Sequence, residues 1–125
     1  MTVSHASKAD IVDRYDVHED KISVASPAVR DQLQSSSSDN QQLIRQQFTN
    51  GLPYFVILGT VQPRKNHMRM FQAFDQFKNR TGSDSKLVVV GHKGWKDEEI
   101  HATLNSMEHK TDVIQTGKVT HEELN

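Results

Sequence analysis

Cysteine is absent from this chain of 125 residues, which is 34% hydrophobic and 25% charged. The absence excludes a disulfide framework and thiolate chemistry. It also favours a reducing compartment, so we expect a cytoplasmic protein. The composition is ordinary for a soluble chain, and the length suffices for about one domain.

An excess of charge of either sign is missing too, because 15 basic and 16 acidic residues leave a net charge of −1. No global field would hold the chain on nucleic acid or anionic lipid, so we expect neither partner. The N-terminal residues Met1 to His5 lack the apolar core of a signal peptide. No apolar run approaches the roughly 18 residues of a membrane span, so secretion and membrane insertion are not expected.

Metal-binding patterns are also lacking. The seven histidines never fall into HxxxH or HExxH spacing, and no cysteine accompanies them, so we predict no metal site. His92 follows Val90-Gly91 and could approach a bound sugar or nucleotide, although an exposed loop histidine is the commoner outcome. We expect Trp95 to pack against the protein rather than stack on a ligand.

Three apolar runs are typical of strands, at Tyr54–Leu58, Leu87–Val90 and Val113–Ile114. Helical patterns separate them at intervals near thirty residues, which suits crossover connections between parallel strands. The predicted fold class is therefore α/β, a Rossmann-like parallel sheet with flanking helices.

Two crossover helices are indicated by their apolar spacing. The first follows Asn66, ends at Gly82 and has its stripe at Met70, Phe71, Phe74 and Phe77, with Gln72, Asp75 and Lys78 facing water. The second begins near Lys96, with acidic residues 97–99 complementing the helix dipole and a stripe at Ile100, Leu104 and Met107. Thr120 and Glu123 form a further capping-box pattern, but the chain stops at Asn125, so we expect no helix there and interpret the chain as cut short.

The N-terminal third is less regular. We predict a helix from about Ser7 to Tyr15, with Ser7 and Asp10 as a capping box, and a short strand from Lys21 to Ala25. Residues 34–50 contain four serines and a run of polar residues, which predicts a linker or mobile loop.

A phosphate-binding turn is the main functional prediction. Gly59 and Thr60 follow a strand that we expect to be buried, and a helix begins shortly after them. Such a turn lets a ligand approach the backbone closely, and the helix N-terminus favours an anion. Arg64 and Lys65 add two cations, although the alternative is a solvated pair without a ligand.

The run Gly-Thr-x-x-Pro-Arg-Lys-Asn at residues 59–66 closely resembles a segment of the retaining family 4 glycosyltransferases, also called glycosyl transferases group 1. Residues 2–8, 88–95 and 116–124 are similar to further segments of the family. The resemblance implies the GT-B architecture, in which two Rossmann-like domains face each other across a cleft. It assigns residues 1–33 to the end of the N-terminal, acceptor-side domain and 51–125 to the first part of the C-terminal, nucleotide-sugar-binding domain.

The resemblance also implies site residues. Gly59 and Thr60 would face the donor diphosphate, with Arg64 and Lys65 as its cations. Gly91 and His92 would lie near the nucleotide or sugar, and Val119 beside the base. Neither a metal nor another cofactor is implied. The family's catalytic pair of glutamates lies beyond the last residue, and we interpret Glu122 and Glu123 as partners of a helix dipole rather than substitutes.

The function expected from this resemblance is transfer of a sugar, with retention, from a nucleotide-sugar donor to an unknown acceptor. The isolated chain is expected to be inactive. The alternative is a noncatalytic nucleotide- or protein-binding remnant of a glycosyltransferase. Three strands and two helices are too few to cover a sheet on both faces, so we also expect exposed apolar edges and self-association through them.

Overall fold

The computed structural model describes residues 1–28 and 36–124, and the chain divides into two compact units, residues 1–34 and 35–125. The predicted boundary between residues 33 and 34 lies outside the described residues.

The first unit contains helix α1, His5–Tyr15, and a 3₁₀ turn, Glu19–Lys21. Ser4 caps the helix, since its hydroxyl oxygen accepts a hydrogen bond from the Ser7 N–H at 3.1 Å. The predicted capping box at Ser7 is therefore wrong, because the helix begins two residues earlier. The predicted strand is also wrong: Val24 makes only an isolated parallel bridge with Thr2, and the chain beyond Thr2 turns into α1.

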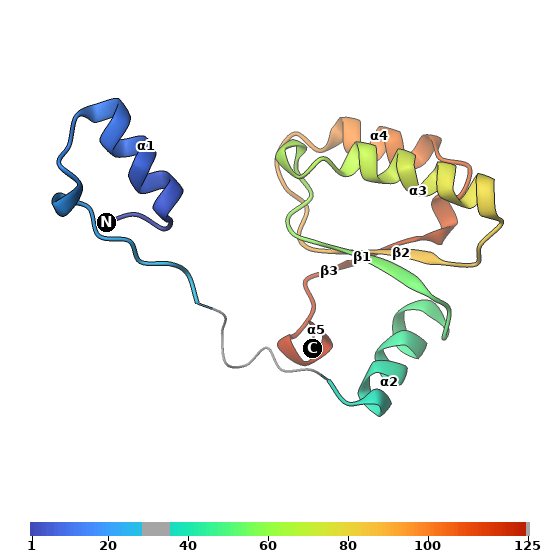
Figure 1. Ribbon diagram of the computed structural model, residues 1–125. Helices are drawn as coiled ribbons and strands as arrows, with labels where there is room; N and C mark the ends of the chain where they lie inside the picture. The colour runs from blue at the N-terminus through green and yellow to red at the C-terminus, as the bar shows by residue number, and fades with distance from the viewer. Residues whose placement is uncertain (29–35, 125) are drawn as a thin grey trace. The chain divides into compact units, whose positions relative to one another are not determined.

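The second unit is built on a parallel sheet (Figure 1). Its strands are β1, Tyr54–Leu58, β2, Lys86–Val90, and β3, Val113–Gly117, in the order β1-β2-β3. Helix α3, His67–Thr81, connects β1 to β2, and α4, Glu98–Ser106, connects β2 to β3. Short 3₁₀ turns lie at Pro63–Lys65 and Lys110–Asp112. The three predicted strands, both crossover helices and the α/β class are confirmed.

The core lies between the sheet and these two helices, which cover the same face (Figure 1). Its buried members come from both helices, from β2 and from the turn after β1: Val61, Phe71, Phe74, Leu87, Val89, Ile100, Leu104 and Met107. The expected apolar stripe of α4 is thus buried in full, and α3 ends as predicted at Gly82, which is left-handed with φ 62°.

Two side chains of α3 that we expected to face water, Asp75 and Lys78, contact other parts of the protein instead. Lys78 is buried with its ammonium 2.6 Å from the Asp112 carboxylate, which Lys86 also contacts. Asp75 accepts hydrogen bonds from the backbone N–H groups of Glu108 and His109. Both corrections have one cause, because the segment between α4 and β3 returns past the C-terminal half of α3.

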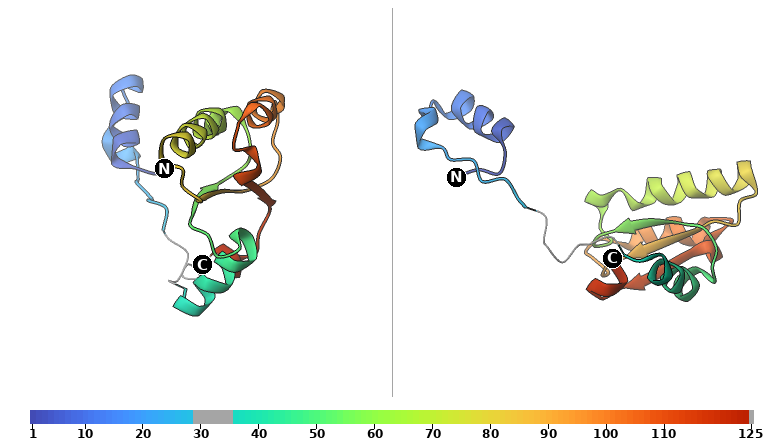
Figure 2. Two further views of the ribbon diagram at one scale, coloured as in Figure 1. Left: turned by 90° about the vertical axis from the view of Figure 1, so that its right-hand side faces the viewer. Right: turned by 60° about the horizontal axis from the view of Figure 1, so that its bottom comes forward.

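The other face of the sheet carries α2, Ser38–Thr49, and the single turn α5, His121–Leu124 (Figure 2). The described part of the predicted linker is therefore a helix. Ser37 caps it by accepting from the Asn40 N–H at 3.3 Å, and Ile44 and Phe48, four residues apart, are half-buried. Regular apolar spacing thus outweighs the serine-rich start.

The capping box before α5 is confirmed. The Thr120 N–H donates to the Glu123 carboxylate at 2.8 Å, and the Glu123 N–H donates to the Thr120 hydroxyl at 3.2 Å. The expectation that no helix would form there is wrong. These reciprocal bonds give hydrogen-bond partners to backbone N–H groups at the start of α5, so a single helical turn forms. Gln47 of α2 also donates to Glu123 at 3.0 Å, which joins the two helices.

Strand β1 is far more exposed than expected. Phe55 is 51%, Val56 58% and Leu58 62% exposed, so the prediction of a buried strand is wrong. The expectation of exposed apolar edges is confirmed by the same residues. In the part of the chain that the structure describes, no helix is long and apolar enough to cross a membrane.

Candidate functional site at the carboxyl edge of the sheet

One glycine stands at the carboxyl end of each strand. Gly59 follows β1, Gly91 follows β2 and Gly117 ends β3. The Gly59 N–H donates to the Val90 carbonyl at 2.8 Å, and the Gly91 N–H donates to the Gly117 carbonyl at 2.8 Å. These bonds continue the sheet by one residue and hold the three chain turns side by side.

The first two turns touch so closely that no side chain fits between them. A β-carbon placed on Gly91 would lie 2.0 Å from the Gly59 carbonyl oxygen, and the φ of Gly91 is 152°. A β-carbon on Gly94 would lie 2.3 Å from the Val61 carbonyl oxygen, which accepts the Gly94 N–H at 3.0 Å. Both positions need glycine, which leaves backbone rather than side chains at this part of the edge.

A cavity of about 660 Å³ opens above these turns. It brings together five residues that the sequence singled out, which are Gly59, Thr60, Gly91, His92 and Val119. The remaining lining residues are Leu58, Val90, Lys118, Thr120, His121 and Leu124. Cavities at the carboxyl ends of parallel strands are where α/β folds bind ligands.

Neither of the two predicted cations lines this cavity, and they differ in how they lie with respect to the Gly59 turn. Lys65 lies over Gly59, since a β-carbon placed on Gly59 would be 3.6 Å from its Cε and 3.9 Å from its Nζ. Arg64 is exposed on the same 3₁₀ turn and does not line the cavity. Lys65 is therefore placed to contact a ligand at the Gly59 turn, whereas the described position of Arg64 is that of a solvated side chain.

Sequence reasoning missed Lys118 and His121, which also line the cavity. Lys118 adds a cation on the β3 side, opposite Lys65 on the β1 side. The only available signal was its position next to Val119, because its approach to the other turns depends on how β3 joins the sheet.

A model of the family described as glycosyl transferases group 1 matches residues 39–125. The chain belongs to this family. It is similar to the serotype-specific mannosyltransferase WbdA of Escherichia coli, at 38% identity over 48 residues, 38% of this chain and 6% of that protein. It is also similar to the O-antigen chain mannosyltransferase B of Escherichia coli, at 25% identity over 99 residues, 78% of this chain. The chain spans 26% of the length of this second relative.

The match covers most of the chain and agrees with the Rossmann-like fold that its sheet displays. It begins inside α2 and includes every residue that lines the cavity. The assignment of residues 1–33 and 51–125 to two domains of the family's architecture stays a prediction.

His67 is a second residue that the sequence did not single out. It is the first residue of α3 and only 1% exposed, and neither of its ring nitrogens has a hydrogen-bond partner. Burial lowers the pKa of His67, the Gln62 backbone opposes this without forming a normal hydrogen bond, and the charge of Lys65 lowers it further. The lowered pKa favours the neutral imidazole, whose ring lies 6.2 Å from the ring of Phe71, centre to centre.

The two glutamates near the end of the chain do not line the cavity. Glu123 caps α5, and the Thr120 backbone hydrogen bond, followed by those from Gln47 and the Thr120 hydroxyl, lowers the pKa of its carboxyl. Its oxygens are thus engaged in structure, as the interpretation from sequence expected. In residues 1–28 and 36–124, moreover, no three metal-ligating side chains gather into a cluster.

Trp95 does not pack as predicted. It is 59% exposed, and the Lys96 ammonium lies 5.7 Å from the centre of its ring. The turn that carries it is held instead by the backbone contact between Gly94 and Val61.

Proposed function

We propose that this chain binds the diphosphate of a nucleotide-sugar donor at the carboxyl edge of its sheet, as part of a retaining, family 4 glycosyltransferase of GT-B architecture. The observation that carries the proposal is the contact of Gly91 with Gly59 beneath the Lys65 side chain. Bare backbone next to a cation is what close approach of phosphate oxygens requires.

We assign roles to residues of the cavity and to Lys65 beside it. Gly59 and Thr60 present backbone to the diphosphate, and Lys65 neutralises its charge, with Lys118 as a second cation. Further roles follow the resemblance: Gly91 and His92 lie near the sugar, and Val119 contacts the base. Arg64 would have to turn toward the cavity to take part.

Cations fixed at this place would act on the chemical step as well as on binding. Breaking the bond between sugar and phosphate builds negative charge on the leaving diphosphate, and charges already in position stabilise it more than they stabilise the donor. This proposal needs no metal and no cofactor besides the donor itself.

The sugar we propose is mannose, because both relatives named above are mannosyltransferases. The acceptor is a glycan, a lipid-linked sugar or a small molecule. The protein residues that bind it belong to the acceptor-side domain. We also propose a cytoplasmic location, which the lack of cysteine favours.

A second candidate function is noncatalytic binding of a nucleotide or protein. It is favoured by one observation, that no carboxylate lines the cavity within the described residues. A chain of this kind would bind the diphosphate without turning over the donor.

Calorimetric titration with GDP, UDP and ADP tests the proposal. We expect one of them to bind, and Lys65→Ala to weaken it by about ten- to a hundredfold, the value of one charge-assisted hydrogen bond of roughly 1.5–3 kcal/mol. Lys110→Ala is the matched control. Lys110 lies directly before β3, at the amino ends of the strands and away from the proposed diphosphate site. Absence of binding to the folded chain, or equal loss in both variants, would contradict the proposal.

Release of sugar from the matching nucleotide-mannose separates the two candidates. Because the isolated chain is expected to be inactive under both candidates, donor hydrolysis and transfer to simple mannosides are assayed on a protein that joins this chain to the remaining segments of the proposed GT-B architecture. Turnover above the uncatalysed rate supports the enzyme, whereas tight diphosphate binding without turnover in that protein supports the noncatalytic candidate.

A further inference from the structure

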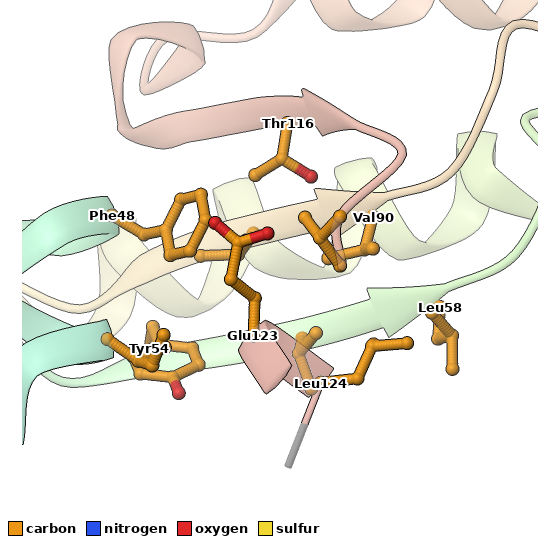
Figure 3. A pocket seen from close by; sticks show the side chains of 11 residues that line it. Phe48, Tyr54, Leu58, Val90, Thr116, Glu123 and Leu124 are labelled. Carbon is orange, nitrogen blue, oxygen red and sulfur yellow. The ribbon is translucent and has the colours of Figure 1, made fainter. Parts of the chain in front are cut away.

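Trp95 is exposed at a place that differs from the other exposed apolar residues of the second unit. Tyr54, Leu58 and Leu124, for example, surround a pocket of about 180 Å³ with Phe48 of α2 at the open edge of β1 (Figure 3). A further strand of the sheet and its helix would cover them. Trp95 instead lies on the loop after β2, the middle strand, and the turns after β1 and β3 flank this loop. Extension of the sheet at β1 therefore does not account for the exposure of Trp95.

Backbone contacts fix the loop that carries Trp95. The Val61 N–H donates to the His92 carbonyl at 2.9 Å, and the Gly94 N–H donates to the Val61 carbonyl at 3.0 Å. These bonds tie the loop to the chain that follows β1, on both sides of Lys93. Trp95 follows directly after this anchor.

The loop is also held on its other side. Asp97 is buried, and its carboxylate lies 3.2 Å from Nε2 of His101 and 3.7 Å from the ammonium of Lys93. Between the two anchors, Lys96 has a φ of 51°. In the described residues, the other non-glycine residues with positive φ are an aspartate and two asparagines, which adopt this region more readily than lysine. Strained backbone that is held by its surroundings clusters at binding sites.

Trp95 and Lys96 together suit a sugar ring. The Lys96 ammonium lies over the indole, 5.7 Å from its centre. The C–H groups on one face of a pyranose pack against an aromatic ring, and its hydroxyl oxygens accept hydrogen bonds from an ammonium. A tryptophan makes such a contact at a low entropic cost, because its side chain has only two torsions. Acidic residues 97–99 follow directly, which favours a neutral sugar over an anionic ligand.

We propose that Trp95 and Lys96 form a second carbohydrate site, which binds one pyranose of a glycan chain outside the donor cavity. Trp95 is not among the residues that line that cavity. The inference rests on the proposed function, because the carboxyl edge of the sheet is then the side at which a glycan meets the donor. It adds one contact, from the nucleotide-sugar-binding side, to those assigned above to the acceptor-side domain.

The fluorescence of Trp95 is a direct test, because the chain has no other tryptophan. Titration with linear α-mannotriose should quench or blue-shift its emission, with half-saturation on the order of 1 mM, as for a ligand held by one stacked ring and a few hydrogen bonds. Mannitol is the control ligand, because it is rich in hydroxyl groups but has no ring. It should leave the emission unchanged up to about 100 mM, roughly a hundredfold above the expected half-saturation.

Saturation-transfer NMR of mannotriose extends the test to variants without tryptophan. Trp95→Ala should weaken binding at least about tenfold, whereas Trp95→Phe, which keeps an aromatic ring, should stay within about threefold of the parent chain. Lys96→Asn keeps a residue that tolerates positive φ but removes the ammonium, and should weaken binding by about three- to tenfold. Tyr15→Ala removes an exposed aromatic side chain of the first unit and is the matched control, with no change expected.

Titration of the same variants with GDP, UDP and ADP separates this inference from the proposed function. Nucleotide binding by the folded chain without any effect of mannotriose on Trp95, or equal mannotriose binding by Trp95→Ala, would overturn the inference alone. Weaker nucleotide binding by folded Trp95→Ala would assign Trp95 to the donor site and would also overturn it. Failure of all three nucleotides to bind would contradict the proposed function, while the mannotriose titrations would still decide the inference.

Discussion

Gly91 lies directly against the backbone of Gly59, since a β-carbon at residue 91 would be 2.0 Å from the Gly59 carbonyl oxygen. This contact fixes the turns after β1 and β2 relative to each other. It therefore also fixes the floor of the cavity in which we propose that the donor diphosphate binds.

Gly91→Ala should destabilise the second unit by at least about 3 kcal/mol, because a backbone clash adds to an unfavourable φ. Gly82→Ala is the matched control: Gly82 is also left-handed, but nothing lies within 4 Å of its missing β-carbon. We expect it to cost about 1–2 kcal/mol. Urea denaturation measures both, and equal losses would show that the contact between the turns is not tight.

The secondary structure of the second unit was largely readable from sequence. Apolar, β-branched runs predicted the three strands, and the three- and four-residue spacing of Phe71, Phe74 and Phe77 predicted α3. Such signals are local, so they survive without knowledge of the neighbours. Helix α2 was missed because its serine-rich start is typical of a loop, although Ile44 and Phe48 already showed helical spacing.

Contacts between distant segments could not be predicted. Lys78 was expected on the surface because nothing nearby in the sequence announces Asp112, 34 residues later. The predicted site shows the same division: Gly59 and Thr60 were found from a local turn pattern, whereas Lys118 reaches the cavity through the placement of β3. No sequence pattern predicts that the ring nitrogens of His67 are buried without hydrogen-bond partners.

Asp112→Asn should lower the free energy of unfolding at pH 7 by about 3 kcal/mol, because it leaves the buried Lys78 ammonium without its partner. Three kcal/mol is the lower end for such pairs, and Asp112 keeps some exposure. Adding Lys78→Met removes the stranded charge and should recover part of the loss. A double variant less stable than Asp112→Asn alone would contradict this account of the pair.

The same carboxyl gives a pH dependence. Burial would raise the pKa of Asp112, but hydrogen bonds from Lys78 and Lys86 outweigh it and hold the pKa below the ordinary value of 3.8. The folded state therefore binds fewer protons, so the stabilisation is present above pH 3.8 and is lost as pH falls through the folded pKa. Urea denaturation between pH 2.5 and 6 should show this loss in the parent chain and a smaller one in Asp112→Asn.

His67 predicts a second decline, at higher pH. Its pKa lies below the ordinary value of 6.5, so the folded state favours the neutral ring and stability falls as pH drops below 6.5. His67→Leu should remove this decline and, by deleting two unsatisfied nitrogens, raise stability at pH 8 by about 1 kcal/mol. His121→Gln, which alters an exposed histidine, should keep the decline. Denaturation curves from pH 5 to 8 decide, and an unchanged decline in His67→Leu would rule out this ring as the source.

The central claim is that the donor diphosphate binds at the carboxyl edge of the sheet, and backbone amide NMR during titration with the binding nucleoside diphosphate tests it most directly. The account predicts the largest shift changes at Gly59, Thr60, Gly91 and Val119, and none at Ser85 or Asp112 at the opposite edge. Shift changes centred on the opposite edge, or none at saturating nucleotide, would contradict it.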